Sequence, residues 1–223
     1  MTAVVLVLVM ASVLAAVTVR DHKRLRVSRT SLFNAAAAAL DKPKITYCGD
    51  GFPKLRGRCN GFEVHADLIP DTMVVRRLPQ LWLSVTLLAP DRELPGMGVL
   101  VRYAGNEFYS LTTEFKHRLE PPPGLPREVL IRAAKPEAQS LLDELRQPLA
   151  RLLSDPHVKE VAITAKGLRI VRQAAEGRRG DHLLLRQASF DTTSIPLGEF
   201  QAVLTELQAL HLAVGQRISA RAA

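Results

Sequence analysis

The sequence predicts an α+β protein: an N-terminal transmembrane helix followed by a domain of mainly antiparallel sheet with two packed helices. Three observations lead to this fold class. An uncharged apolar run opens the chain, short β-branched runs separated by Gly and Pro fill the first half, and leucine-rich stretches with helical spacing follow. Of the 223 residues, 47% are hydrophobic and 23% charged, so the domain can bury a stable core without disulfides or metal.

The chain begins with eighteen consecutive uncharged residues, from Thr2 to Val19. A helix needs roughly 17–25 mainly apolar residues to cross a bilayer, so the run predicts a transmembrane helix over residues 1–19. A cleaved signal peptide is disfavoured because nothing basic precedes the run. A buried or interfacial helix is the remaining alternative.

A basic flank follows the apolar run and contains Arg20, Lys23, Arg24, Arg26 and Arg29. Because Lys and Arg beside a membrane helix stay on the cytoplasmic side, we expect a single-pass protein of the bacterial inner membrane with its C-terminal domain in the cytoplasm. The same side chains would face anionic lipid headgroups. The flank, counted with Asp21, carries four of the eight net positive charges, so the high pI is weak evidence for nucleic acid.

The flank belongs to a segment, residues 20–42, that ends in an alanine run. Ser28 or Ser31 can cap a helix there, alanine has the highest helix propensity, and Pro43 would end the helix. The sequence therefore predicts a connector helix that leads away from the membrane.

Residues 43–134 form a region rich in predicted strands, which lie at about residues 45–48, 62–69, 81–88, 98–104, 107–115 and 127–133. The run 81–88 is almost continuously apolar, which is typical of a strand buried on both faces. Pro121, Pro122 and Pro123 make the clearest break in the chain, and we interpret them as a stiff loop between two subdomains.

Residues 135–217 are expected to form a helix, a β-meander and a second helix, with a frayed tail over 218–223. Leucines at helical spacing between 141 and 153 mark the first helix, and Pro148 should kink it or end its first half. The meander has predicted strands at 158–164, 167–173 and 182–187. The last helix, at about 197–215, has the apolar stripe Phe200, Val203, Leu204, Leu207, Leu210 and Leu212.

The two cysteines, Cys48 and Cys59, lie eleven positions apart. A hairpin between them would bring them close, and they would pair in an oxidising compartment but remain free thiols in the cytoplasm. The sequence leaves both states open, and a disulfide would contradict the expected topology.

No catalytic, cofactor-binding or metal-binding motif is present, so we assign no such residues and expect no cofactor. Two groups of arginines and aromatics are candidates for a binding surface: Arg76 and Arg77 near Trp82, and Phe108 and Tyr109 near Arg118. The favoured interpretation is that Trp82 and Phe108 belong to the core.

The chain resembles bacterial membrane-associated domains of unknown function in the order of its segments. These are LRGRCNGFEVHADLI, LWLSVTLL, a Pro-rich loop, a Leu-rich helix, the strands VAIT and LRIV, and LGEFQAVLTELQAL. Gly57 and Gly61 match the Gly-x-x-x-Gly strand opening of those domains. The resemblance covers about residues 44–215. It implies a fold and a membrane-proximal location, but no activity and no site residues.

The expected function is therefore a membrane-anchored binding or interaction module, with the membrane and possibly another protein as partners. The sequence does not assign the oligomeric state. Two alternatives remain: an electrostatic binder of anionic lipid or nucleic acid, and, with less support, an enzyme whose site is assembled from scattered residues such as Asp71, Glu114, His117 and Arg118.

Overall fold

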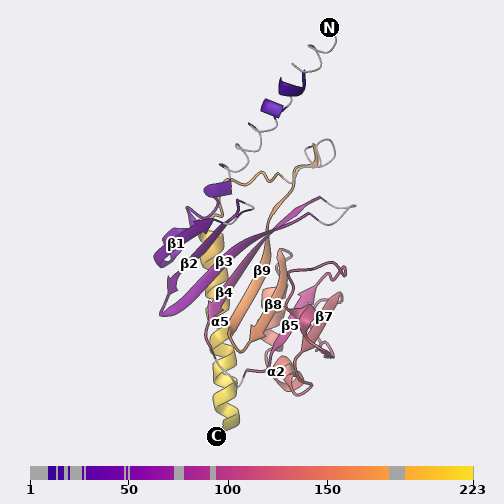
Figure 1. The fold of residues 1–223 in the computed structure, drawn as a ribbon. Helices are drawn as coiled ribbons and strands as arrows, with labels where there is room; N and C mark the ends of the chain where they lie inside the picture. Colours follow the sequence, from indigo (N-terminus) through magenta and orange to yellow (C-terminus); the bar gives the residue numbers. More distant parts are fainter. Residues whose placement is uncertain are drawn as a thin grey trace.

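The computed structural model describes residues 10–13, 15–17, 20, 27, 29–47, 49, 51–72, 78–90, 94–180 and 189–222. These residues form one sheet of nine strands in the order β1-β2-β3-β4-β9-β8-β5-β7-β6, with helices packed against it (Figure 1). All of its strand pairs are antiparallel. The predicted α+β class with a mainly antiparallel sheet is confirmed.

The strands of the first half of the sheet are β1 (Asp41–Tyr47), β2 (Pro53–Cys59), β3 (Phe62–Asp71) and β4 (Gln80–Leu88). Those of the second half are β5 (Met97–Val101), β6 (His117–Arg118), β7 (Val129–Ala133), β8 (Val158–Thr164) and β9 (Gly167–Glu176). Strand β9 pairs with both β4 and β8 and so joins the halves. The proline run connects the neighbouring strands β6 and β7, so it lies within one sheet and not between two subdomains.

The helical segments are the 3₁₀ helices η1 (Ala36–Ala39) and η2 (Thr112–Glu114) and the α-helices α2 (Ala138–Glu144), α3 (Arg146–Leu153) and α5 (Leu197–Ala222). Helix α5 packs across β4, β9 and η1 on one face of the sheet (Figure 1). Its apolar stripe is buried as predicted, except that Val214 takes the place of Leu212, which is 63% exposed. Leu212 is two residues beyond Leu210, about 200° around the helix, and therefore points away from the sheet.

The predicted connector helix is wrong beyond Thr30, although Arg29 and Thr30 are helical. Residues 31–35 form turns, and the alanine run forms only the single 3₁₀ turn η1 before β1 begins at Asp41. Leu32, Phe33 and Ala36 are buried, and the Phe33 ring meets that of Phe200 of α5 edge-on at 6.5 Å. The burial of these side chains therefore overrides the intrinsic helix propensity of alanine.

The predicted break in the leucine-rich helix is confirmed: α2 ends at Glu144 and α3 starts at Arg146. Pro148 explains the position, since it has no N–H and its ring crowds the carbonyl four residues earlier, that of Glu144. Helix α5 continues to Ala222, beyond its predicted end at about residue 215 and through the tail predicted to be frayed.

Two strand predictions differ from the structure. The predicted strand over 107–115 is a loop that contains η2, and strand β2 was not predicted. The signal for β2 was Asn60-Gly61, whose φ angles of 49° and 86° form the two-residue turn to β3. The predicted third strand of the meander, 182–187, lies outside the described residues, and beside it Gly177 bridges to Phe190.

Within the described residues, no helix has the length and apolar character needed to cross a membrane. Much of the predicted transmembrane helix, namely residues 1–9, 14, 18 and 19, lies outside that part of the chain. Its described residues, 10–13 and 15–17, are helical, and Met10, Val13 and Val17 are exposed there.

Candidate binding surfaces

The face of the sheet opposite α5 is partly covered by a loop over residues 102–116, which includes η2 and is called the 102–116 loop below. Side chains alternate along a strand, so β4 turns Leu83 and Val85 toward α5, and Trp82 and Ser84 toward the opposite face. All four are buried. The prediction that residues 81–88 form a strand buried on both faces is therefore confirmed, and the loop helps to bury the second face: its Tyr109 packs on Trp82.

The first anchor of the loop is a buried ion pair. Lys159 of β8 donates hydrogen bonds to Glu107 Oε1 at 2.8 Å and to the Arg102 carbonyl at 2.7 Å, and the two charged side chains are only 7% and 3% exposed. The Glu107 carboxylate also accepts the backbone N–H groups of Ala104 and Gly105 at 2.8 and 3.0 Å. Burial alone would raise the pKa of Glu107, but these hydrogen bonds and the Lys159 charge lower it overall.

The second anchor is Glu160, the next residue of β8, which is completely buried. Its Oε1 accepts hydrogen bonds from the hydroxyl groups of Ser110 and Thr112 and from the Thr112 backbone N–H, while Arg169 of β9 lies 3.7 Å from its Oε2. Arg169 also donates to the Tyr109 carbonyl at 2.7 Å. The loop is thus tied to two central strands of the sheet by charged hydrogen bonds, which are stronger than neutral ones.

Aromatic side chains of the 102–116 loop lie on both sides of it. Tyr109 faces the sheet, with its ring 5.7 Å from that of Trp82. Phe108 meets the outer side of Tyr109 edge-on at 5.4 Å and is 58% exposed, and Tyr103 is 49% exposed. The interpretation of Trp82 as core is confirmed, but that of Phe108 is wrong. The reason is that Tyr109 fills the place against the sheet, which turns its neighbour Phe108 to the surface.

The Tyr109 hydroxyl group is buried and, among the described residues, has no hydrogen-bond partner. Burial raises the pKa of Tyr109, and the nearby carboxylates of Asp71, Glu107 and Glu160 raise it further. The phenol is therefore neutral at physiological pH, and its ring fills the space between the loop and Trp82.

The four residues named for a scattered enzyme site do not come together. Asp71 is buried at the end of β3, where Trp82 Nε1 lies 3.5 Å from its carboxylate, whereas Glu114, His117 and Arg118 are exposed. Strands β3 and β6 are third and ninth in the sheet order, which separates them by roughly 29 Å at about 4.8 Å per strand. Arg76 and Arg77, the other candidates near Trp82, lie outside the described residues.

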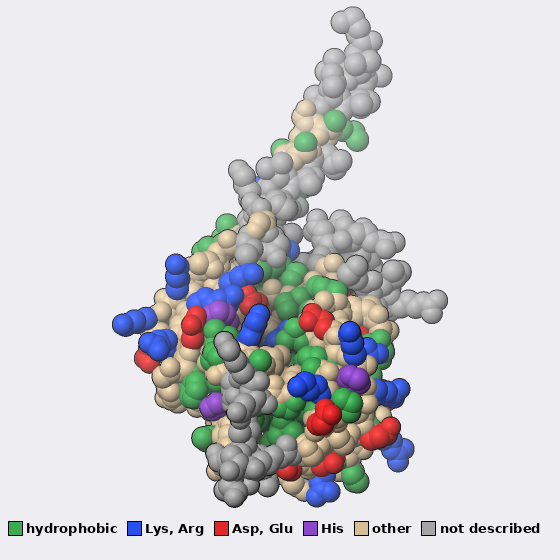
Figure 2. All heavy atoms as spheres, turned by 60° about the horizontal axis from the view of Figure 1, so that its bottom comes forward, with side chains coloured by type: hydrophobic (Ala, Val, Ile, Leu, Met, Phe, Trp, Pro, Cys, Tyr) green, Lys and Arg blue, Asp and Glu red, His purple; other side chains and the backbone are tan. Residues whose placement is uncertain are grey.

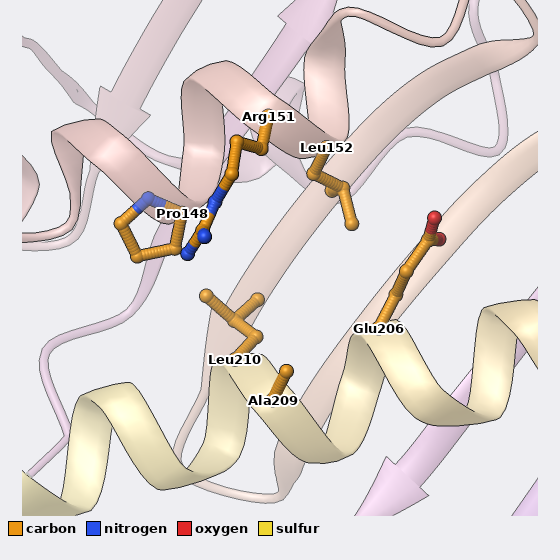
Figure 3. Close-up of a pocket in the computed structure, with 6 residues that line it drawn as sticks. All are labelled: Pro148, Arg151, Leu152, Glu206, Ala209 and Leu210. Atoms are coloured by element: carbon orange, nitrogen blue, oxygen red, sulfur yellow. The ribbon is translucent and has the colours of Figure 1, made fainter.

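A second surface feature is an open groove between α3 and α5, with a volume of about 260 Å³ (Figure 3). Its lining residues are Pro148, Arg151, Leu152, Glu206, Ala209 and Leu210. Burial raises the pKa of Glu206, as does the charge of Asp155, while Arg172 acts in the opposite direction. Arg172 is itself paired with Asp155 at 3.2 Å.

The basic flank is described in part. Arg20 is helical and exposed, and the Arg29 guanidinium lies over the Phe52 ring at 4.4 Å, so Arg29 is also held by the domain. Lys23, Arg24 and Arg26 lie outside the described residues. Elsewhere, basic and acidic side chains are interspersed, as Figure 2 shows for the end of the molecule where α5 terminates. Asp67, for example, lies within 3.7 Å of Lys54 and 3.3 Å of Arg56.

Cys59 is a free thiol that accepts a hydrogen bond from Gln208 of α5 at 3.4 Å, and Cys48 lies outside the described residues. Tyr47, the neighbour of Cys48, is opposite Pro53, at the other end of β2 from Cys59. Six residues of strand correspond to roughly 20 Å, far more than a disulfide spans. Tyr47 and Cys59 therefore lie at opposite ends of the β1–β2 hairpin. In the described part of the chain, no three His, Cys, Asp or Glu side chains are placed to hold a metal ion.

Comparisons of the chain with family models, with curated proteins and with solved structures gave no match. The resemblance to bacterial membrane-associated domains therefore stays a prediction, and the functional argument depends on the residues described above.

Proposed function

We propose that the chain is a single-pass, membrane-anchored binding module whose domain faces the cytoplasm of a bacterium and recognises a partner protein through the 102–116 loop. The observation that carries the anchor is the exposure of Met10, Val13 and Val17, all helical, within eighteen uncharged residues. In water such a surface is unfavourable by about 25 cal/mol per Å² of apolar area, whereas lipid accommodates it.

The basic flank supports the orientation. Five Lys or Arg residues lie within ten positions of the apolar run, and none precedes it. Moving this flank across the membrane is disfavoured, so the domain that follows it stays on the cytoplasmic side. The cation–π contact of Arg29 with Phe52 connects the end of the flank to the domain, which favours a short distance between domain and bilayer.

The 102–116 loop supports the recognition of a protein. Exposed aromatic side chains contribute strongly to protein interfaces, and they lose little conformational entropy if they are already fixed. Phe108 is fixed by Tyr109, and Tyr109 by Trp82 and by the bond from Arg169 to its carbonyl. The partner that fits this surface is a protein with an apolar pocket for Phe108.

Membrane fractionation tests the anchor. The full chain should remain with membranes after an alkaline wash, and a variant lacking residues 2–19 should become soluble. A C-terminal reporter active only in the cytoplasm should be active, and replacing Arg20, Lys23, Arg24, Arg26 and Arg29 by Gln should reduce that activity. Recovery of the intact full chain in the soluble fraction would contradict the proposal.

Photocrosslinking in intact cells tests the recognition. A photoreactive amino acid at position 108 should form a discrete adduct, and the same amino acid at Leu212, which is equally exposed on α5, should not. Tyr103→Ala should reduce the yield at position 108. Equal adducts at both positions, or none at position 108, would refute the assignment of the loop.

A further inference from the structure

The groove between α3 and α5 has opposite charges on its two walls and an apolar floor. Arg151 comes from α3 and Glu206 from α5, while Leu152 and Leu210 lie between them (Figure 3). The Arg151 side chain extends toward Pro148 and Leu210, and the Glu206 carboxylate lies nearer Leu152 (Figure 3). The two charged groups therefore lie at different ends of the groove (Figure 3).

Neither charge is neutralised by a direct partner. Among the described residues, Arg151 and Glu206 take part in no ion pair, and Glu206 Oε2 is buried without a hydrogen-bond partner. The charge of Arg172 of β9 acts on Glu206, but Arg172 is itself paired with Asp155 at 3.2 Å. The Asp155 carboxylate also accepts a hydrogen bond from the His157 backbone N–H, and His157 Nδ1 lies 3.0 Å from the same oxygen. Arg151 is exposed and Glu206 is half-buried, so the two walls place one cation and one anion along the same groove.

We propose that this groove binds a small zwitterion, a molecule with an ammonium group and a carboxylate at the two ends of a short apolar body. The ammonium group pairs with Glu206, the carboxylate pairs with Arg151, and the methylene groups lie on Leu152 and Leu210. The volume of about 260 Å³ suits a molecule of this size, and the groove is concave, which excludes a flat protein surface as the occupant. This site is independent of the membrane anchor and of the 102–116 loop.

The charge pattern makes the proposal specific. A simple amine would leave Arg151 without an anion and would be repelled by it. A simple carboxylate would leave Glu206 unpaired and would be repelled by it in the same way. Only a ligand with both charges pairs with Arg151 and Glu206 together, and 5-aminopentanoate carries an ammonium group and a carboxylate at the two ends of an apolar body.

The test is a titration of the full chain in detergent micelles, followed by the methyl NMR signals of Leu152 and Leu210. The probes are 5-aminopentanoate, pentylamine and pentanoate, which share one apolar body. We expect saturable shifts with 5-aminopentanoate and affinities at least tenfold weaker for the other two. Arg151→Gln and Glu206→Gln should each weaken the binding of 5-aminopentanoate about tenfold.

Two matched controls lie on the same helices. Arg146→Gln on α3 and Glu199→Gln on α5 change exposed charges outside the groove and should leave the affinity within twofold. The proposal is overturned if 5-aminopentanoate gives no saturable shift up to 100 mM, if pentylamine or pentanoate binds as tightly, or if the control variants weaken binding as much as the groove variants.

Discussion

The Glu107→Gln substitution tests whether the buried charges hold the 102–116 loop. It preserves the size of the side chain and one acceptor oxygen but removes the negative charge beside Lys159, 2.8 Å away. Since both side chains are almost completely buried, the ammonium group would lose its counter-ion without gaining water. Breaking a buried pair in this way costs about 3–5 kcal/mol, and because a Gln oxygen in the place of Oε1 still accepts from Lys159 and from the Ala104 N–H we expect about 3 kcal/mol here.

A double-mutant cycle isolates the pair from other effects of the substitution. Lys159→Met removes the cation but keeps the aliphatic stem, and the double variant Glu107→Gln/Lys159→Met has neither charge. The double variant should lose less stability than the two single variants lose together, because no unpaired charge is then buried. The difference, which is the coupling energy, should be about 2 kcal/mol. Unfolding in urea can be followed by the fluorescence of Trp82, the only tryptophan, whose ring lies 5.7 Å from Tyr109 under the loop.

The pH dependence gives an independent check. Because the folded-state pKa of Glu107 is lowered, the stabilisation by this carboxylate is complete above its ordinary value of 4.5 and is lost as the pH falls through the lowered pKa. The difference between the parent chain and Glu107→Gln should therefore shrink below about pH 4. A loss under 0.5 kcal/mol for Glu107→Gln, or strictly additive losses in the cycle, would refute the anchoring role of the pair.

Three further predictions concern single positions. Because the folded-state pKa of Glu206 is raised, Glu206→Gln should raise stability at pH 7. The gain should shrink at acidic pH, where the glutamate is neutral as well, and urea titrations at pH 4 and 7 check this. Gly98→Ala should cost about 1–3 kcal/mol, since its Cβ would lie 2.3 Å from Thr112 Oγ1, and an unchanged melting temperature would contradict this packing. Gly215→Ala, where an added Cβ meets nothing within 4 Å, should instead stabilise α5 by about 0.5–1 kcal/mol, as a thermal melt can show.

The sequence predicted the elements whose pattern is local. Alternating or continuous apolar runs identified β3, β4, β7, β8 and β9, and leucine spacing identified α2, α3 and α5. Pro148 located the break between α2 and α3, because the missing N–H acts on the helix that contains it. The same local reasoning missed β2, although Asn60-Gly61 signalled its hairpin, since basic side chains on one face hid its apolar alternation.

The candidate surfaces could not be predicted in the same way. Glu107 and Lys159 are 52 positions apart, and Ser110 and Glu160 are 50 apart, so only the position of β8 between β5 and β9 brings them together. Arg151 and Glu206 likewise line the same groove only because α3 packs against α5.

By itself, the sequence determined the α+β class and the continuous apolar character of β4, because periodicity and hydrophobicity act over a few neighbouring residues. It is also the source of the proposed membrane anchor, through an uncharged run and the charges that flank it. Only the tertiary structure decided that β9 joins the two halves into one sheet, that the alanine run is a 3₁₀ turn with Ala36 buried, and that Phe108 points outward while Tyr109 points inward. These outcomes depend on which distant side chains compete for the same buried space, and that competition has no local signature in the sequence.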